Sequence, residues 1–197
     1  IVATSKNKLD NRIEDECKKL DIGCYRGSEN DVLDRFYKAA KLYGFSDILR
    51  VTGDCPLIDP VIVDKIIDKY KNCDVDYVTN TMPPTFPDGL DVEVFSLKVL
   101  KDSWIKTKNQ KQFREHVTTY IRKNDKIKKI NYRYREDYSF LRLTLDDVVD
   151  YKVITKILNQ FSNIYDFDIN DLVSLYKKKK YLFLENIKTK RNEGENM

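Results

Sequence analysis

The sequence is poor in the residues and motifs that mark several large classes of protein. It has one histidine and four cysteines that form no CxxC pair, so we expect no zinc site and assign the cysteines to the reduced state usual in the cytoplasm. No apolar run approaches the roughly 18 residues of a membrane span, and no signal peptide is visible. Neither a P-loop nor a GxGxxG motif occurs, which leaves kinase and dehydrogenase functions without support. These absences predict a cytoplasmic protein with no membrane partner.

The formal net charge of +4 does not indicate a nucleic-acid partner. Residues 177–197 contain seven Lys or Arg and three Glu, and they account for the whole excess. The rest of the chain therefore carries as many acidic as basic side chains. A lysine run at a helix end is usually a solvated face, so no nucleic-acid surface is predicted.

The alternation of apolar segments predicts an α/β fold. A length of 197 residues with 41% hydrophobic composition suits one domain, which we place at residues 1–188 before a polar tail at 189–197. Strands alternating with helices of 10–15 residues indicate βαβ units and a mostly parallel sheet. The expected strands are 1–4, 23–27, 47–52, 76–79, 90–95, 127–135 and 140–145. The last two could pair with each other in antiparallel orientation. The expected helices are 7–20, 31–43, one starting at Asp59 and Pro60, 97–123, 148–161 and 169–180.

Two acidic residues directly follow predicted strands. Asp54 lies in RVTGDCPLIDP after the strand 47–52, and Asp146 lies in LRLTLDD after the strand 140–145. Ligands of open α/β sheets bind outside the carboxyl ends of the strands. If these strands are near neighbours, the two carboxylates could share one Mg²⁺, which takes one or two carboxylates together with water and substrate phosphates. The pattern alone leaves open that each is a turn acid.

A second candidate site lies in CYRGSENDVLDRF. A strand end, a Gly-Ser turn and a helix start place Arg26, Ser28 and Asp31 where an anion or a ribose could bind. The alternative is an ordinary capped helix start, with Ser28 or Asn30 as the cap.

A third group of polar residues surrounds the proline-rich loop MPPTFPDG. Asp91 and Glu93 point to the same face of a strand, and with Asn80 and Asp88 they could form a wall for a polyol. The alternative is a solvent-facing strand edge. His116 follows an acid, but no Ser or Cys nucleophile pairs with it, so a hydrogen-bonding or structural role is favoured over catalysis.

Five ordered motifs together resemble one family. YRGSENDVLDRF, RVTGDCPLIDP, DYVTNTMPPTFPDGLDVEVFS, REHVTTYI and LRLTLDD occur in this order, and they are similar to the SpsF-type cytidylyltransferases of spore coat polysaccharide biosynthesis. These enzymes are relatives of the CMP-sialic acid and CMP-Kdo synthetases. The resemblance covers about residues 1–160. It implies a three-layer α/β/α sandwich with the Rossmann-like fold of nucleotide-diphospho-sugar transferases.

The resemblance also implies a reaction and a set of roles. A hydroxyl of a sugar, with an acid sugar favoured, attacks the α-phosphate of CTP, and pyrophosphate leaves. Family members often form dimers, so a homodimer is compatible with the resemblance. The implied catalytic and metal-binding residues are Asp54 and Asp146, with Mg²⁺ as cofactor. The implied nucleotide side holds Arg26, Ser28, Asp31 and Thr52. The implied sugar side holds Asn80, Asp88, Asp91, Glu93 and His116.

The sequence departs from the family pattern in two places. Val148 replaces the proline of the usual Glu-Pro-x-Asp after the second aspartate, although Asp147 and Asp150 remain. The loop of the form A-R-x-x-S-x-R-L-P-x-K, which grips CTP in relatives, does not precede IVATS. We therefore expect a fragment of such an enzyme, with a non-catalytic scaffold domain as the alternative. A GT-A-type glycosyltransferase is less favoured, because GDC at 53–55 lacks the acid-x-acid pair of those enzymes.

Overall fold

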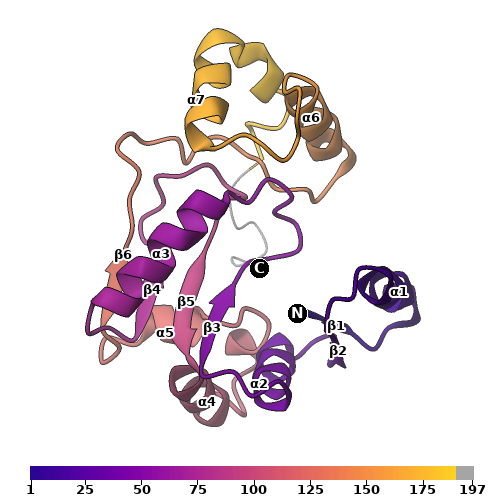
Figure 1. The fold of residues 1–197 in the computed structure, drawn as a ribbon. Coiled ribbons are helices and arrows are strands. Elements are labelled where there is room, and N and C mark those ends of the chain that lie inside the picture. Colours follow the sequence, from indigo (N-terminus) through magenta and orange to yellow (C-terminus); the bar gives the residue numbers. More distant parts are fainter. Residues whose placement is uncertain (190–197) are drawn as a thin grey trace. The chain divides into compact units, whose positions relative to one another are not determined.

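The computed structural model describes residues 1–189, and Figure 1 shows their path. The chain forms two compact units, and each of them is built from two separate segments. Unit 1 comprises Ile1–Ile48 and Phe95–Lys128, and unit 2 comprises Leu49–Val94 and the chain from Lys129 onward. Except for Thr189, the predicted polar tail lies outside the described residues. The prediction that residues 1–188 act as one domain stays a prediction.

Unit 1 contains a small parallel sheet and several helices. Strand β1 pairs with β2 in parallel, in a register that sets Val2 opposite Cys24 and Ser5 opposite Gly27. The elements of this unit are β1 (Val2–Ser5), η1 (Lys8–Asp10), α1 (Asn11–Lys19), β2 (Cys24–Gly27), α2 (Val32–Leu42), α4 (Leu97–Lys106), η2 (Lys111–Phe113) and α5 (Thr119–Lys123).

Helix α2 is fixed at its start by a cap and along its length by α4. The side chain of Asp31 accepts a hydrogen bond from the backbone N–H of Asp34, which satisfies one of the free donors at the helix start. The ring of Trp104 in α4 stacks on Tyr37 at 4.6 Å between centroids, and its indole N–H donates to Asp34 at 2.8 Å. The side chain of Leu33 is fully buried. An apolar stripe and an acidic cap therefore suffice to define this helix.

Unit 2 contains most of a four-stranded sheet, one helix between two of its strands and the helices that follow its last strand in the sequence. The strand order is β3-β5-β4-β6, and β4 pairs with β6 in parallel. The strands are β3 (Asp47–Arg50), β4 (Tyr77–Thr79), β5 (Glu93–Ser96) and β6 (Lys129–Asn131), and the boundary between the units falls within β3 and β5. The helices are α3 (Pro60–Asn72), α6 (Val148–Leu158), α7 (Ile169–Lys178) and η3 (Lys180–Phe183).

The core of unit 2 is apolar and is organised around α3. Asp59 caps this helix by accepting from the N–H groups of Val61 and Ile62, and Pro60 occupies its first turn, as the sequence predicts. Ile62 and Ile66 point into the core, and burying such a side chain contributes roughly 1.5–3 kcal/mol. The second oxygen of Asp59 accepts from the N–H of Ile169 at 2.8 Å, so one carboxylate fixes the starts of both α3 and α7.

The α/β class and the parallel strand pairing agree with the sequence analysis, but several predicted elements are wrong. Residues 140–145 form no regular strand, because only Arg142 bridges to Asp88 before Gly89 turns the backbone to a φ of +99°. Strand β6 therefore pairs with β4, not with 140–145. The predicted helix 97–123 is broken into α4, η2 and α5. Helix α2 is capped by Asp31, not by Ser28 or Asn30. Among the described helices, none is long and apolar enough to cross a bilayer.

Candidate active site

Asp54 and Asp146, the two acids predicted to follow strands, lie on adjacent stretches of backbone in unit 2, although only Asp54 follows a strand in the structure. Asp54 follows β3 in a turn closed by the N–H of Cys55, which donates to the carbonyl of Thr52 at 3.3 Å. Asp146 precedes α6, and its neighbour Leu145 donates its N–H to the carbonyl of Asp54 at 2.8 Å. This bond joins segments that are distant in the sequence. The structure therefore brings together the two residues that the sequence predicts as metal ligands, while their role stays a prediction.

The exposure of these two acids suits ligands of a solvated cation. Asp54 is half-buried, and the side chain of Asp146 is 54% exposed. Within residues 1–189, no three His, Cys, Asp or Glu side chains are arranged to hold a metal by themselves. A pair of carboxylates fits Mg²⁺, which keeps several waters and binds substrate phosphates, better than it fits a metal that needs a full protein cage.

Arg142 is the centre of the charge network beside Asp146. Its guanidinium is buried and donates to Asp146 at 2.5 Å and to Asp150 at 2.9 and 3.0 Å. Asp88, one of the predicted sugar-side residues, lies 3.6 Å from the same guanidinium. Burial would lower the pKa of Arg142, but the bonds to Asp150 and Asp146 outweigh burial and raise it. One buried cation thus orients three acids, of which only Asp146 is exposed.

Asp150 is the innermost of these acids. It lies in the first turn of α6 and is fully buried. It accepts from Arg142, from the backbone N–H of Asp146 at 3.1 Å and from the side-chain amide of Asn186 at 2.8 Å. Burial would raise the pKa of Asp150, but the hydrogen bonds from Arg142 and Asn186 outweigh burial and hold it below its usual value. Asp150 is therefore a buried carboxylate that holds Arg142, Asn186 and the backbone of Asp146 in place.

Glu93 is also engaged within the protein. Its carboxylate accepts from the guanidinium of Arg50 and from the hydroxyl of Tyr77, and the side chain is buried. This position contradicts the alternative of a solvent-facing strand edge. Asp91, predicted to share this strand, lies just before β5 begins at Glu93 and is half-buried. Both assignments to the sugar side stay predictions.

Asn80 holds the proline-rich loop closed. Its side chain is fully buried, donates to the carbonyl of Leu90 at 2.7 Å and accepts from the N–H of Val92 at 2.9 Å. The amide thereby ties the end of β4 to the start of β5 across the loop 81–91. Its effect on a sugar would come through the shape of that loop.

Thr52 is the first residue of the turn that carries Asp54. Its hydroxyl lies 3.1 Å from the sulfur of Cys55. Burial raises the pKa of the Cys55 thiol to about 12, and the nearby Asp54 acts in the same direction. The thiol is therefore neutral and unreactive, and it serves to pack the turn. The assignment of Thr52 to nucleotide binding stays a prediction.

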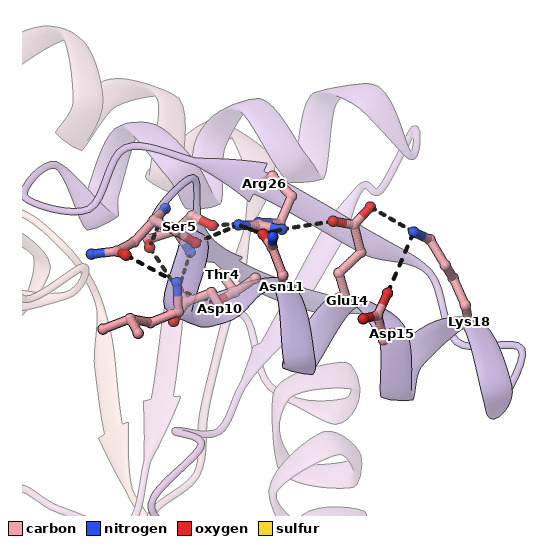
Figure 2. A network of polar contacts seen from close by, with 10 residues as sticks. Thr4, Ser5, Asp10, Asn11, Glu14, Asp15, Lys18 and Arg26 are labelled. Carbon is pink, nitrogen blue, oxygen red and sulfur yellow. Dashed lines mark hydrogen bonds and ion pairs between the residues drawn. The ribbon is translucent and has the colours of Figure 1, made fainter.

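The guanidinium of Arg26 in unit 1 is hydrogen-bonded to several groups of the same unit, as Figure 2 shows. Its guanidinium donates to the carbonyls of Ser5 and Asn7, to the side chain of Asn11, and to Glu14 at 2.6 Å. This network fixes the loop between β1 and α1 against β2. A phosphate would therefore have to compete with established bonds for this arginine, and its nucleotide role stays a prediction.

The other predicted residues of unit 1 lie at the start of α2 and before α5. The carboxylate of Asp31 accepts two-pronged bonds of 2.8 to 3.0 Å from Arg114, which is buried. The hydroxyl of Ser28 accepts from the N–H of Asp31 at 3.0 Å. His116 is half-buried, and its carbonyl accepts from the N–H of Thr119 at 3.1 Å. Helix α5 begins only at Thr119, so His116 precedes it.

Of the residues that orient Asp146, the sequence analysis names only Asp150, as a retained residue of the family pattern, and assigns it no orienting role. Arg142 lies four positions before Asp146 in a non-helical segment, where this spacing does not indicate an ion pair, so no local pattern pointed to Arg142. No local pattern indicated Asn186, since it reaches Asp150 from 36 residues away. Arg50 was likewise assigned only to a strand.

Comparison with known protein families shows the family to which this chain belongs. The family model described as Cytidylyltransferase matches residues 1–192, so the chain belongs to the cytidylyltransferase family.

Two relatives and one solved structure support this placement. The chain is 36% identical over 181 residues to an uncharacterised protein of Methanocaldococcus jannaschii, covering 90% of this chain and 72% of the relative. It is 31% identical over 185 residues to the spore coat polysaccharide biosynthesis protein SpsF of Bacillus subtilis, covering 90% and 74%. A cytidylyltransferase structure from Leptospira borgpetersenii superposes with a TM-score of 0.85 at 33% identity, covering 91% of this chain and 76% of that one.

The comparisons confirm the predicted resemblance to SpsF-type cytidylyltransferases. They also confirm that the chain has the Rossmann-like α/β fold of a nucleotidyltransferase and belongs to that class of enzyme.

Proposed function

We propose that this protein transfers CMP from CTP to a hydroxyl of a sugar in the biosynthesis of a surface polysaccharide, and that the reaction depends on Mg²⁺. The family supports transfer of a cytidylyl group, and the name of the Bacillus subtilis relative supports the polysaccharide. The observation that carries the proposal is the hydrogen bond from the N–H of Leu145 to the carbonyl of Asp54, which joins the two backbone segments that carry Asp54 and Asp146.

The arrangement suggests a division of labour at the reaction centre. Asp54 and Asp146 would hold Mg²⁺, which neutralises the triphosphate and aligns it for attack. Arg142 binds one oxygen of Asp146 and restricts how that carboxylate can turn. The sugar hydroxyl forms a new bond to the α-phosphorus, the bond to pyrophosphate breaks, and the hydroxyl proton passes to a base or solvent. Positioning and charge neutralisation supply most of such a rate enhancement.

The remaining assignments complete the proposal. An acid sugar is the favoured acceptor, and a homodimer in the cytoplasm is the favoured assembly. The proposed nucleotide side consists of Arg26, Ser28, Asp31 and Thr52. The proposed sugar side consists of Asn80, Asp88, Asp91, Glu93 and His116.

Calorimetry of CTP binding tests the metal site without knowledge of the sugar. The intact protein is titrated with CTP in Mg²⁺ and again in EDTA, and the ratio of the two affinities defines the Mg²⁺ enhancement. Asp54→Asn and Asp146→Asn should reduce this enhancement by more than the roughly 10–100-fold that follows loss of an outer-shell partner. The affinity in EDTA should not fall, because each change removes a negative charge that repels the triphosphate.

Asp147→Asn is the matched control for this experiment. Asp147 carries the same charge beside Asp146, but its side chain caps α6 by accepting from the N–H groups of Val149 and Asp150. Asparagine keeps a capping oxygen, so the Mg²⁺ enhancement should match that of the unchanged protein. Equal enhancement in the Asp54, Asp146 and Asp147 variants would refute the metal site. Absence of any CTP binding by the unchanged protein would favour the scaffold alternative.

A further inference from the structure

We infer that Asn186, which follows η3 near the end of the described chain, is a positioning residue for the proposed metal ligand Asp146. It acts through Asp150 and Arg142. This inference rests on the proposed function, because it assigns Asn186 a role at that same metal site.

Asp146 is oriented at its backbone and at one carboxylate oxygen. Its N–H donates to Oδ2 of Asp150 at 3.1 Å, and its own Oδ2 accepts from Arg142 at 2.5 Å. The residue before it, Leu145, is bonded to the carbonyl of Asp54. The side chain is nevertheless 54% exposed, and Oδ1 is the oxygen that Arg142 does not hold, so Oδ1 is the one that can face a cation. Asp150 and Arg142 thus decide how that oxygen is presented.

The pair of Asp150 and Arg142 is buried and depends on complete hydrogen bonding. Oδ1 of Asp150 accepts from Nε of Arg142 at 3.0 Å, and Oδ2 accepts from Nη2 at 2.9 Å. Buried ion pairs are stable only when their remaining donors and acceptors are also satisfied. Removing a donor from Asp150 therefore loosens the groups that orient Asp146.

Asn186 supplies that additional donor from a distant part of the chain. Its side-chain amide nitrogen donates to Oδ1 of Asp150 at 2.8 Å and to the carbonyl of Arg142 at 3.2 Å. Both neighbours are acceptors, so the NH₂ group must face them. One amide therefore bridges the backbone of Arg142 and the carboxylate to which its guanidinium is bonded.

The side-chain oxygen of Asn186, Oδ1, indicates that this residue does more than fill space in the core. Among the described residues, the buried Oδ1 of Asn186 has no hydrogen-bond partner. An unsatisfied buried acceptor is destabilising, and an apolar side chain of the same size would avoid that cost. The presence of asparagine is therefore explained by its two donated bonds, not by space filling.

The Mg²⁺ enhancement of CTP binding tests this role. Asn186→Leu removes both donors without adding charge and should lower the enhancement by roughly 10-fold, as for other outer-shell partners of metal ligands. Asn186→Asp places a carboxylate against Asp150 and should lower it further. The CTP affinity in EDTA should not change in either variant. Glu185→Gln is the matched control, because the neighbouring Glu185 is bonded to Lys156 at the surface and should leave the enhancement unchanged.

The outcomes separate this inference from the proposed function. If Asp146→Asn lowers the enhancement but Asn186→Leu lowers only the melting temperature, Asn186 is merely structural and the inference is overturned. If Asp146→Asn itself leaves the enhancement unchanged, the metal site of the proposed function is wrong. Asn186→Ser keeps one donor and adds no charge, so it provides the same comparison if Asn186→Leu does not fold, with a smaller loss expected.

Discussion

At the scale of single residues, Gly89 is the glycine, among those the structure describes, that is least able to accept a side chain. It has a φ of +99°, and a Cβ there would lie 2.6 Å from the backbone carbon and oxygen of Leu143. The flanking Asp88 exchanges backbone hydrogen bonds with Leu141 and Leu143 at 2.9 and 2.7 Å, so that segment cannot withdraw freely. We expect Gly89→Ala to lower the free energy of unfolding by at least the roughly 1–3 kcal/mol of an overpacked site. Urea denaturation measures this loss.

Alanine variants at two other glycines distinguish the loss of stability caused by a steric clash from that caused by a left-handed backbone. Gly53 has no positive φ, and a Cβ added there would meet no atom within 4 Å, so Gly53→Ala should change stability by less than about 0.5 kcal/mol. Gly44 has a φ of +68° in open space, so Gly44→Ala should lose only the roughly 1–2 kcal/mol of left-handed strain. A Gly89→Ala variant as stable as Gly53→Ala would contradict the close approach to Leu143.

The residues that could be found from the sequence are those with local signals. Asp54 and Asp146 were found because each follows a strand-like segment at a break in its pattern. Asn186 could not be found, because its reason for being asparagine is a pair of acceptors 36 and 44 residues away. Glu93 was found as a polar residue but not as a buried one, since its partners Arg50 and Tyr77 lie on other strands.

At the scale of secondary-structure elements, α7 begins with a complete capping box. The side chain of Asp168 accepts from the N–H groups of Asn170 and Asp171, and the side chain of Asp171 accepts from the N–H of Asp168. Burial would raise the pKa of Asp168, but the bonds from Asp171 and Asn170 outweigh burial and lower it below its usual value of 3.8. The cap is thus strongest when Asp168 is ionised.

This cap predicts how the stability of α7 depends on pH. Asp168→Ala should cost about 1 kcal/mol at pH 7, the usual contribution of a side-chain cap. A lowered pKa in the folded state stabilises the protein above the unfolded pKa, and this contribution is lost as the pH falls through the folded value. The difference between the two proteins in urea denaturation should therefore shrink below about pH 4. Asp166→Ala, which changes an exposed acid nearby, is the control, and a difference that persisted unchanged in strong acid would count against the cap.

Helices were predicted better than strands, for physical reasons that particular segments show. The starts of α2 and α3 carry acidic caps followed by an apolar stripe, and both signals are local. The segment 140–145 has an apolar pattern typical of a strand, but a strand also needs a partner of matching length. The partner here is a single residue, Asp88, because Gly89 turns the chain away. Strand formation thus depended on a distant backbone that the sequence pattern does not describe.

At the scale of the whole molecule, each unit is assembled from two segments that an ion pair with a buried arginine joins. In unit 1, Arg114 binds Asp31 across 83 residues. In unit 2, Arg142 binds Asp88 across the interval between that unit's segments. Neither pair was predicted, since nothing in the local sequence connects an arginine with an acid that far away. These pairs give each unit its own source of stability.

If each unit is stabilised by its own ion pair, then weakening one unit should leave the stability of the other unchanged. Arg114→Met removes the donors to Asp31 and to the carbonyl of Trp104, and it leaves both acceptors without this partner. The cost should lie below the roughly 3–5 kcal/mol of a fully buried pair, because Asp31 is 34% exposed. Sub-global opening depends on local stability. Hydrogen exchange should therefore accelerate in α2 and α4 of unit 1 and stay unchanged in α6 and α7 of unit 2. The neighbouring exposed Glu115 provides the control as Glu115→Gln, and equal acceleration in both units would show that they unfold as one.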